Sequence, residues 1–151
     1  MNKKDYKLQF ELIPEECWRG SLYHNLTPTD WDKVRKDAYA RAGYRCCICG
    51  RKDRLEAHEK WSYDDEKALQ KLEDVLALCH NCHEVKHIGR AQLIGRGADA
   101  MEWFMKVNNC SQMDFHEALG QANAEYKERN KIEGWVTDVS WLKGKFGIQL
   151  K

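Results

Sequence analysis

The spacing of apolar residues in the first 43 positions predicts one short strand followed by one helix. In KLQFELIP, three apolar residues alternate with polar ones up to Pro14, a period typical of a strand. In TPTDWDKVRKDAYARAG, apolar residues recur at helical spacing. Thr29 or Asp30 can cap the start of this helix, and Gly43 can end it.

The pattern in residues 44–95 predicts strand, loop, strand and helix in that order. RLEAHEKW is typical of a strand, SYDDEKALQKLED is a polar connection that could hold a helical turn, and VLALC is a second short strand. The segment HNCHEVKHIGRAQLIG then has helical spacing and ends near Gly95. This order brings the two strands and the helix close together in the chain.

The last third of the chain, residues 96–151, has a mainly helical pattern. After GRG, one helix carries Met101, Phe104 and Met105 on an apolar face, and Ser111 caps a second helix that we expect to pack on the core. The tail GWVTDVSWLKGKFGIQL mixes aromatic and β-branched residues. It could add a strand that pairs with the N-terminal one.

Composition adds limits on domain number, compartment and partners. A chain of 151 residues with 42% hydrophobic residues can bury one core, so we expect a single α+β domain, mainly helical. The charged start and the lack of a long apolar run predict a cytoplasmic protein without a membrane partner. A net charge of +1 gives no global attraction for nucleic acid, so such contacts must come from local basic clusters.

Two Cys-x-x-Cys pairs indicate a metal site. Cys46 and Cys49 form the first pair, Cys79 and Cys82 form the second, and the chain between them is long enough to fold back. Four thiolates about 2.3 Å from the ion are the usual ligands of a structural Zn²⁺. The alternatives are four buried cysteines or a redox-active pair. Cys47 lacks the required separation, so we expect it to pack beside the site.

Three histidines suggest a second metal site. His83 and His87 are four residues apart, a spacing that places both imidazoles on one face of a helix. His58, at the end of the preceding strand, could complete a trio around a divalent cation and leave coordination positions open. The simpler interpretation makes His58 and Glu59 surface residues and makes the other two histidines capping or packing residues.

These motifs together resemble the HNH nucleases. In that family a strand ends in a His-His or Asp-His pair, an Asn follows in the loop, and a helix supplies one or two more ligands. The segment LEAHE…LEDVLALCHNCHEVKH matches the Cys-containing form of this pattern, with the intervals found in the nuclease colicins. The resemblance covers about a third of the chain. It implies a zinc-containing ββα-metal, treble-clef-like core over residues 44–95, preceded by a strand and helix in 1–43 and followed by a helical extension in 96–151.

Carried over position by position, the resemblance makes His58, His83 and His87 the ligands of a catalytic divalent ion, either Mg²⁺, Mn²⁺, Ni²⁺ or Zn²⁺. The chain departs from the family at two positions, because the general-base histidine falls at Glu59 and the motif Asn at Asp74. Glu59 could serve as the base, with Asp74 orienting the loop. Alternatively, one of the two carboxylates could join the metal shell and favour a harder ion.

Several basic residues near the motif could contact phosphates. Lys86 and Arg90 lie one turn apart on the ligand helix. Trp61 is the tryptophan nearest to the proposed site, whereas Trp31 has the helical spacing of a core residue. Solvated surface charge is the alternative interpretation of the cations. The candidate cations are Lys86, Arg90, Arg96, Arg51, Lys52 and Arg54.

We weigh three hypotheses for function. The first is a metal-dependent HNH-type endonuclease that hydrolyses DNA phosphodiester bonds, with zinc at the cysteines as a structural ion. The second is a non-catalytic HNH-derived zinc module that binds nucleic acid or a protein, and it is motivated by the two carboxylates at Glu59 and Asp74. The third is a phage or mobile-element protein whose terminal segments contact a protein partner or a second copy.

Overall fold

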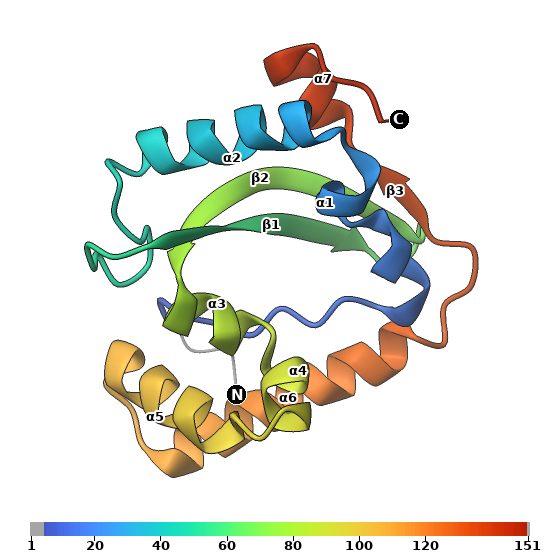
Figure 1. Cartoon of the computed structure of the whole chain (residues 1–151). Coiled ribbons are helices and arrows are strands. Elements are labelled where there is room, and N and C mark those ends of the chain that lie inside the picture. The colour runs from blue at the N-terminus through green and yellow to red at the C-terminus, as the bar shows by residue number, and fades with distance from the viewer. Residues whose placement is uncertain (1–4, 151) are drawn as a thin grey trace.

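The computed structural model describes residues 5–150 as an α+β fold that is mostly helical, with a three-stranded mixed sheet (Figure 1). None of the helices in this range has the length and apolar character needed to cross a membrane. The strands are β1 (Leu55–Asp64), β2 (Leu69–Cys79) and β3 (Val136–Asp138). The helices are η1 (Glu15–Gly20), α1 (Leu22–Asn25), α2 (Pro28–Arg41), α3 (His80–Lys86), α4 (Ile88–Leu93), α5 (Gly97–Asn108), α6 (Gln112–Arg129) and α7 (Ser140–Phe146).

Strands β1 and β2 form one long antiparallel hairpin. Leu55 pairs with Cys79 and Asp64 pairs with Leu69, so both strands run further than we predicted. We expected the polar connection between the strands to hold a helical turn. Most of it instead belongs to the two strands, which are joined by a turn at residues 65–68. The reason is cross-strand pairing, which stabilises polar residues in a strand regardless of their local pattern.

Two predictions about the N-terminal segment are wrong. Residues 8–14 form no strand, and their main chain is instead held by other groups: both amide atoms of Asn108 bond the main chain of Leu8, and Glu11 N donates to Lys86 O at 3.0 Å. The tail does supply a short strand, β3, but it pairs in parallel with the start of β2 rather than with the N-terminal segment.

Helix α2 begins slightly earlier than predicted. Thr27, and not Thr29 or Asp30, is the N-cap, since its hydroxyl accepts a hydrogen bond from Asp30 N at 3.2 Å. Pro28 occupies the first helical position, where a missing N–H costs nothing. Gly43 follows the helix with a φ of 66°, as the sequence predicted for its end.

The segment expected to be one helix from His80 to Gly95 is two. Helix α3 ends at Lys86 and α4 begins at Ile88, because His87 between them has φ −100° and ψ 53°, outside the helical region. Helix α6 does start as predicted: Ser111 accepts a hydrogen bond from Asp114 N, and Asp114 bonds back to Ser111 N.

The hairpin separates two hydrophobic clusters, one on each side (Figure 1). On one side α2 and α7 contribute Val34 and Leu142, both fully buried. On the other side α3, α5 and α6 contribute Val85, Phe104 and Phe115. Phe115 confirms that α6 packs on the core. The segment with Leu8 and Glu11 crosses this second side and so comes close to the hairpin and α3.

Candidate metal centre

The four cysteines of the two Cys-x-x-Cys pairs converge where β1 begins and β2 ends. Their sulfur atoms all lie within 4.8 Å of one another, and Cys49 Sγ is 3.7 Å from Cys79 Sγ. Two sulfurs bound to one tetrahedral Zn²⁺ at about 2.3 Å are about 3.8 Å apart. Cys46, Cys49, Cys79 and Cys82 therefore fit a Zn²⁺ site.

Local backbone geometry directs the first pair of cysteines toward the second. Gly50 adopts a φ of +75°, which favours glycine, and its N–H donates to Cys46 O at 2.9 Å to close the turn. The sulfur of Cys79 caps α3 by accepting from Cys82 N. Cys47 lies outside the group of four, as its spacing predicted, but it is exposed and not packed as we expected.

Hydrogen bonds favour a thiolate at Cys46, whereas burial raises the pKa of Cys79 and the hydrogen bond with Cys46 raises that of Cys82. The Cys82 thiol and nearby backbone N–H groups stabilise a thiolate at Cys46 and lower its pKa to about 4. The indole Nε1–H of Trp103 donates to Cys82 Sγ at 3.3 Å. Such bonds orient a sulfur and stabilise its negative charge, which is the form that binds metal.

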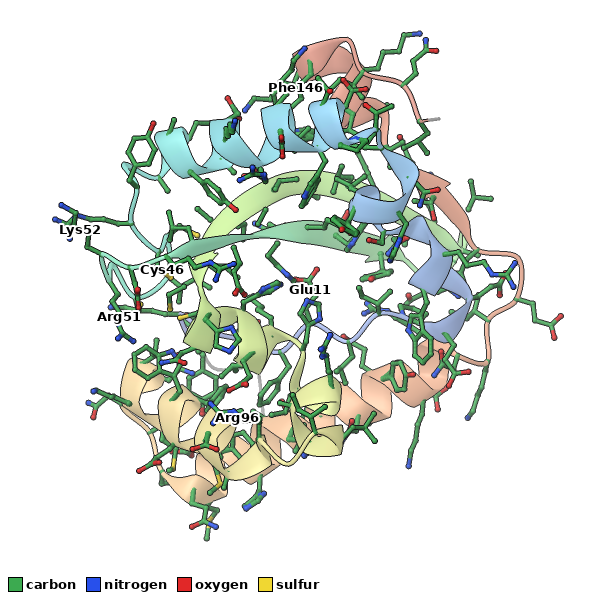
Figure 2. All side chains as sticks on the ribbon, viewed as in Figure 1. Glu11, Cys46, Arg51, Lys52, Arg96 and Phe146 are labelled. Atoms are coloured by element: carbon green, nitrogen blue, oxygen red, sulfur yellow. The ribbon has the colours of Figure 1, made fainter. Side chains whose placement is uncertain are left out.

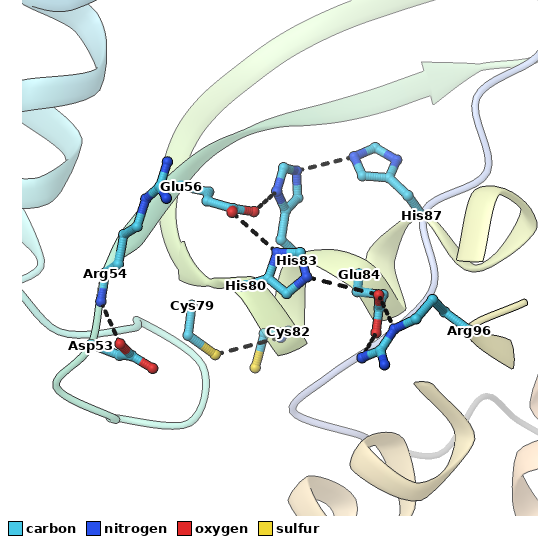
Figure 3. A network of polar contacts seen from close by, with 10 residues as sticks. All are labelled: Asp53, Arg54, Glu56, Cys79, His80, Cys82, His83, Glu84, His87 and Arg96. Atoms are coloured by element: carbon cyan, nitrogen blue, oxygen red, sulfur yellow. Dashed lines mark hydrogen bonds and ion pairs between the residues drawn. The ribbon is translucent and has the colours of Figure 1, made fainter. Parts of the chain in front are cut away.

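The three histidines also converge, from β1, from the middle of α3 and from the residue that follows α3. One nitrogen from each of His58, His83 and His87 lies within 4.8 Å of the others. Nε2 of His83 and Nε2 of His87 are 3.2 Å apart, and Figure 3 shows the two rings turned toward each other. Two imidazole nitrogens on one tetrahedral ion, each about 2.05 Å away, are about 3.3 Å apart. The trio could therefore hold a metal ion.

His83 and His87 are held in the neutral form that binds a cation. Burial is the largest cause that lowers the pKa of His83 and of His87, and the nearby His58 adds to it. For His87 the pKa falls to about 3. Both rings are therefore neutral at pH 7, and a neutral imidazole has a lone pair to donate to a metal.

Two carboxylates that we did not predict orient the histidines. Glu11 Oε2 lies 2.5 Å from His58 Nε2, and Glu11 Oε1 accepts from Trp61 N at 3.1 Å. Glu56 Oε1 lies 2.8 Å from His83 Nδ1, as Figure 3 shows. Metal-binding histidines commonly donate their second N–H to a carboxylate, which fixes the ring. His58 Nδ1 and His83 Nε2 are then the nitrogens left for an ion.

Glu11 carries the negative charge that a carboxylate needs in order to orient a metal-binding histidine. Burial alone would raise the pKa of Glu11, but the hydrogen bond and charge of His58 outweigh it, and the pKa lies below its ordinary value. Figure 2 places Glu11 at the centre of the molecule, between the hairpin and the helices of the other layer. An ionised carboxylate there can accept a hydrogen bond from His58 Nε2–H, so that Nδ1 is the nitrogen that faces an ion.

Replacing Glu11 with Gln is expected to weaken metal binding at the histidines by 10- to 100-fold, as is typical when such an orienting carboxylate is lost. Calorimetric titration of Ni²⁺ into protein whose cysteine site already holds Zn²⁺ measures this affinity. Glu117→Gln is the matched control, because Glu117 is exposed on α6 away from the site. Equal Ni²⁺ affinity in the parent and Glu11→Gln would contradict the orienting role.

The histidines open onto a cleft of about 500 Å³. Its lining also includes Glu59, Trp61 and Arg90, together with aromatic side chains from η1, α1 and α2. The sequence had suggested Trp61 alone among the tryptophans near the site, but Trp18 and Trp31 line the cleft as well. The cleft gives a ligand direct access to the open side of the histidine trio.

The two carboxylates at the positions where HNH enzymes have His and Asn lie in different places. Glu59 lines the cleft, and its Oε1 accepts a hydrogen bond from Leu22 N at 3.0 Å. Burial raises the pKa of Glu59. Asp74 does not line the cleft and is outside the histidine group; its Oδ1 lies 3.3 Å from a guanidinium nitrogen of Arg41 on α2.

Of the six candidate phosphate contacts, one reaches the cleft. Arg90 lines it and is exposed. Lys86 is half-buried and lines a separate cavity of about 550 Å³ with Lys60, and burial lowers its pKa. Arg96 donates to both carboxylate oxygens of Glu84, at 3.1 and 3.2 Å (Figure 3).

The other three candidates sit on the loop that carries the first cysteine pair. Figure 2 shows Arg51 and Lys52 at this loop, away from Glu11. The Arg51 guanidinium lies 5.6 Å from the ring centre of Trp103 and 3.5 Å from a carboxylate oxygen of Asp53. Lys52 and Arg54 are exposed.

Comparison of the chain with protein-family models, with curated proteins and with solved structures finds no significant match in any of the three. The site must therefore be interpreted from its own residues.

Proposed function

We propose that this chain is a metal-dependent phosphodiesterase of the HNH type that cleaves DNA. The observation that carries the proposal is the convergence of His58, His83 and His87 on the wall of an open cleft. Catalytic metal sites in proteins commonly have three protein ligands and at least one open position, whereas structural sites are closed. The four-cysteine cluster is the closed site in this arrangement, and the histidine trio is the open one.

The order of the elements also supports the HNH assignment. His58 lies on the first strand of a hairpin, the second strand ends in Cys79, and α3 follows at once with His83. This is the strand, strand, helix order of the ββα-metal enzymes that the sequence resembles. The cysteine site would then fix the end of the hairpin and the start of α3.

The histidines, Glu59 and Arg90 each have a role in the proposed reaction. When bound at the histidines, a divalent ion would polarise a phosphate oxygen and stabilise the leaving oxygen. Glu59 would accept a proton from the attacking water, and Arg90 would contact the phosphate. The bond from Leu22 N uses one of about four lone-pair positions on the Glu59 carboxylate, so the group can still accept a proton.

The test is cleavage of supercoiled plasmid and of a single-stranded DNA circle in Mg²⁺, Mn²⁺, Ni²⁺ or Zn²⁺, with EDTA controls. We expect cleavage only with a divalent ion, and we expect Glu59→Gln to slow it by 10²- to 10⁴-fold, the usual contribution of a general base. Glu66→Gln, at an exposed position of the hairpin turn, should cleave at the parent rate.

Two results would count against the proposal in different ways. Parent-like cleavage by Glu59→Gln would remove Glu59 from the reaction. Absence of cleavage with all four metals on both DNA forms would reject the enzyme.

A second candidate function is a non-catalytic zinc module that binds nucleic acid or a protein partner. The observation that favours it is the engagement of both altered positions: Glu59 is bonded to Leu22 N, and Asp74 is paired with Arg41. In this function the histidines stabilise the fold. Binding of an oligonucleotide without cleavage in any metal would support it.

A further inference from the structure

Besides the histidines, four aromatic side chains line the cleft: Trp61 of β1 is buried, and two of the other three are unusually exposed. Trp18 of η1 is 60% exposed and Tyr23 of α1 is 65% exposed, while Trp31 of α2 is half-buried. The indole of Trp18 is nevertheless fixed, because its Nε1–H donates to Ile13 O at 2.7 Å. The ring of Tyr23 meets that of Trp31 edge to face, with centres 6.3 Å apart. A fixed, exposed ring loses little entropy when a flat ligand stacks on it.

Positive charge at the cleft is sparse by comparison. Arg90 is the one arginine or lysine among the described residues that line it. Arg96 is engaged with Glu84, and Arg51 with Asp53. Proteins that bind a DNA duplex usually neutralise several phosphates with a continuous basic surface. Binding at this cleft must therefore draw on its rings more than on phosphate contacts.

From these observations we propose that Trp18 and Tyr23 stack against an unpaired nucleobase. The adjoining phosphodiester group then lies against the histidine trio and Arg90. The substrate class is single-stranded nucleic acid, or a loop, flap or end with unpaired bases, since a base inside a duplex offers no free face and must first leave its stack. The cleavage part of this inference rests on the proposed function, whereas the stacking part is a statement about binding.

Binding is measured with the full chain and a fluorescein-labelled single-stranded oligonucleotide, and with a duplex of the same sequence, without added divalent ion. Fluorescence anisotropy should give tighter binding to the single strand. Trp18→Ala should weaken single-strand binding by about 5- to 150-fold, the range for losing one stacked base, and leave duplex binding unchanged. Trp18→Phe should restore most of the affinity because it keeps a ring.

Tyr44→Ala is the matched control, since Tyr44 is 63% exposed but does not line the cleft. It should bind the single strand as the parent does. Equal affinity for single strand and duplex overturns the inference. So does parent-like single-strand binding by Trp18→Ala when its thermal unfolding matches that of the parent.

Cleavage assays separate this inference from the proposed function. Single-strand binding that depends on Trp18, without cleavage in any metal, keeps the inference on binding and rejects the enzyme. Cleavage of a single-stranded circle and of relaxed duplex at equal rates, both unaffected by Trp18→Ala, keeps the enzyme and overturns the inference. Faster cleavage of the single strand, lost in Trp18→Ala and restored in Trp18→Phe, supports both.

Discussion

Replacing His83 with Ala is expected to reduce metal-dependent DNA cleavage to the background level. His83 contributes Nε2, 3.2 Å from His87 Nε2, and is oriented by Glu56, so its loss removes one of three ligands and the orientation of the trio. Two imidazoles hold a divalent ion far more weakly than three, and an ion lost from the cleft cannot stabilise the transition state. Bound metal should fall from two ions per chain to one.

The variant should still fold, because Ala is favourable in a helix and the four cysteines remain. Circular dichroism checks this point, and metal analysis counts the ions. His116→Ala is the control, since His116 is exposed on α6 and belongs to neither metal group. A His83→Ala protein that cleaves DNA at the parent rate would show that the histidine trio does not carry the reaction.

Replacing Cys79 with Ser is expected to abolish cooperative folding. Ser is a good N-cap, so it can keep the contact that the Cys79 sulfur makes with Cys82 N and lose only the metal bond. A structural Zn²⁺ site contributes about 10–16 kcal/mol of binding free energy, which is as large as the whole stability of a typical domain, about 5–15 kcal/mol. The variant should therefore contain no zinc and show no sharp thermal transition.

The chain supplies a close control for this variant. Cys47 is only one residue from Cys46, but it is exposed and outside the group of four. Cys47→Ser should keep its zinc and its unfolding temperature. If Cys79→Ser melted like the parent, the cysteine cluster would not be what holds the hairpin to α3.

The sequence was sufficient to identify both metal groups because each depends on short, regular spacings. Cys-x-x-Cys turns and histidines four residues apart on a helix bring their side chains together through local geometry alone. The kink at His87 did not prevent this, because α3 runs to Lys86 and His87 N still donates to His83 O. Caps at Ser111 and the helix end at Gly43 were predictable for the same reason.

The parts that the sequence did not predict depend on contacts between distant segments. Glu11 lies 47 positions before His58. The alternating pattern of its segment predicts a strand, and the tertiary contacts with Asn108 and α3 that prevent one are not visible in the sequence. The position of Glu56 could have been predicted from the sequence. Glu56 and His58 are two residues apart on one strand, and such residues lie on the same face of a sheet. The two exposed rings of the cleft come from η1 and α1, whose short lengths leave almost no periodic pattern.

The contact between Glu11 and His58 has a consequence for the order in which the protein becomes complete during synthesis. Glu11 is made before every other residue of the histidine site, yet its segment is fixed by Lys86 O and by Asn108, at the end of α5. A nascent chain that stops before residue 108 can already contain all seven proposed ligands. It lacks the two Asn108 contacts that hold the main chain of Leu8, so the segment with Glu11 takes its final place beside His58 only after residue 108 has been made.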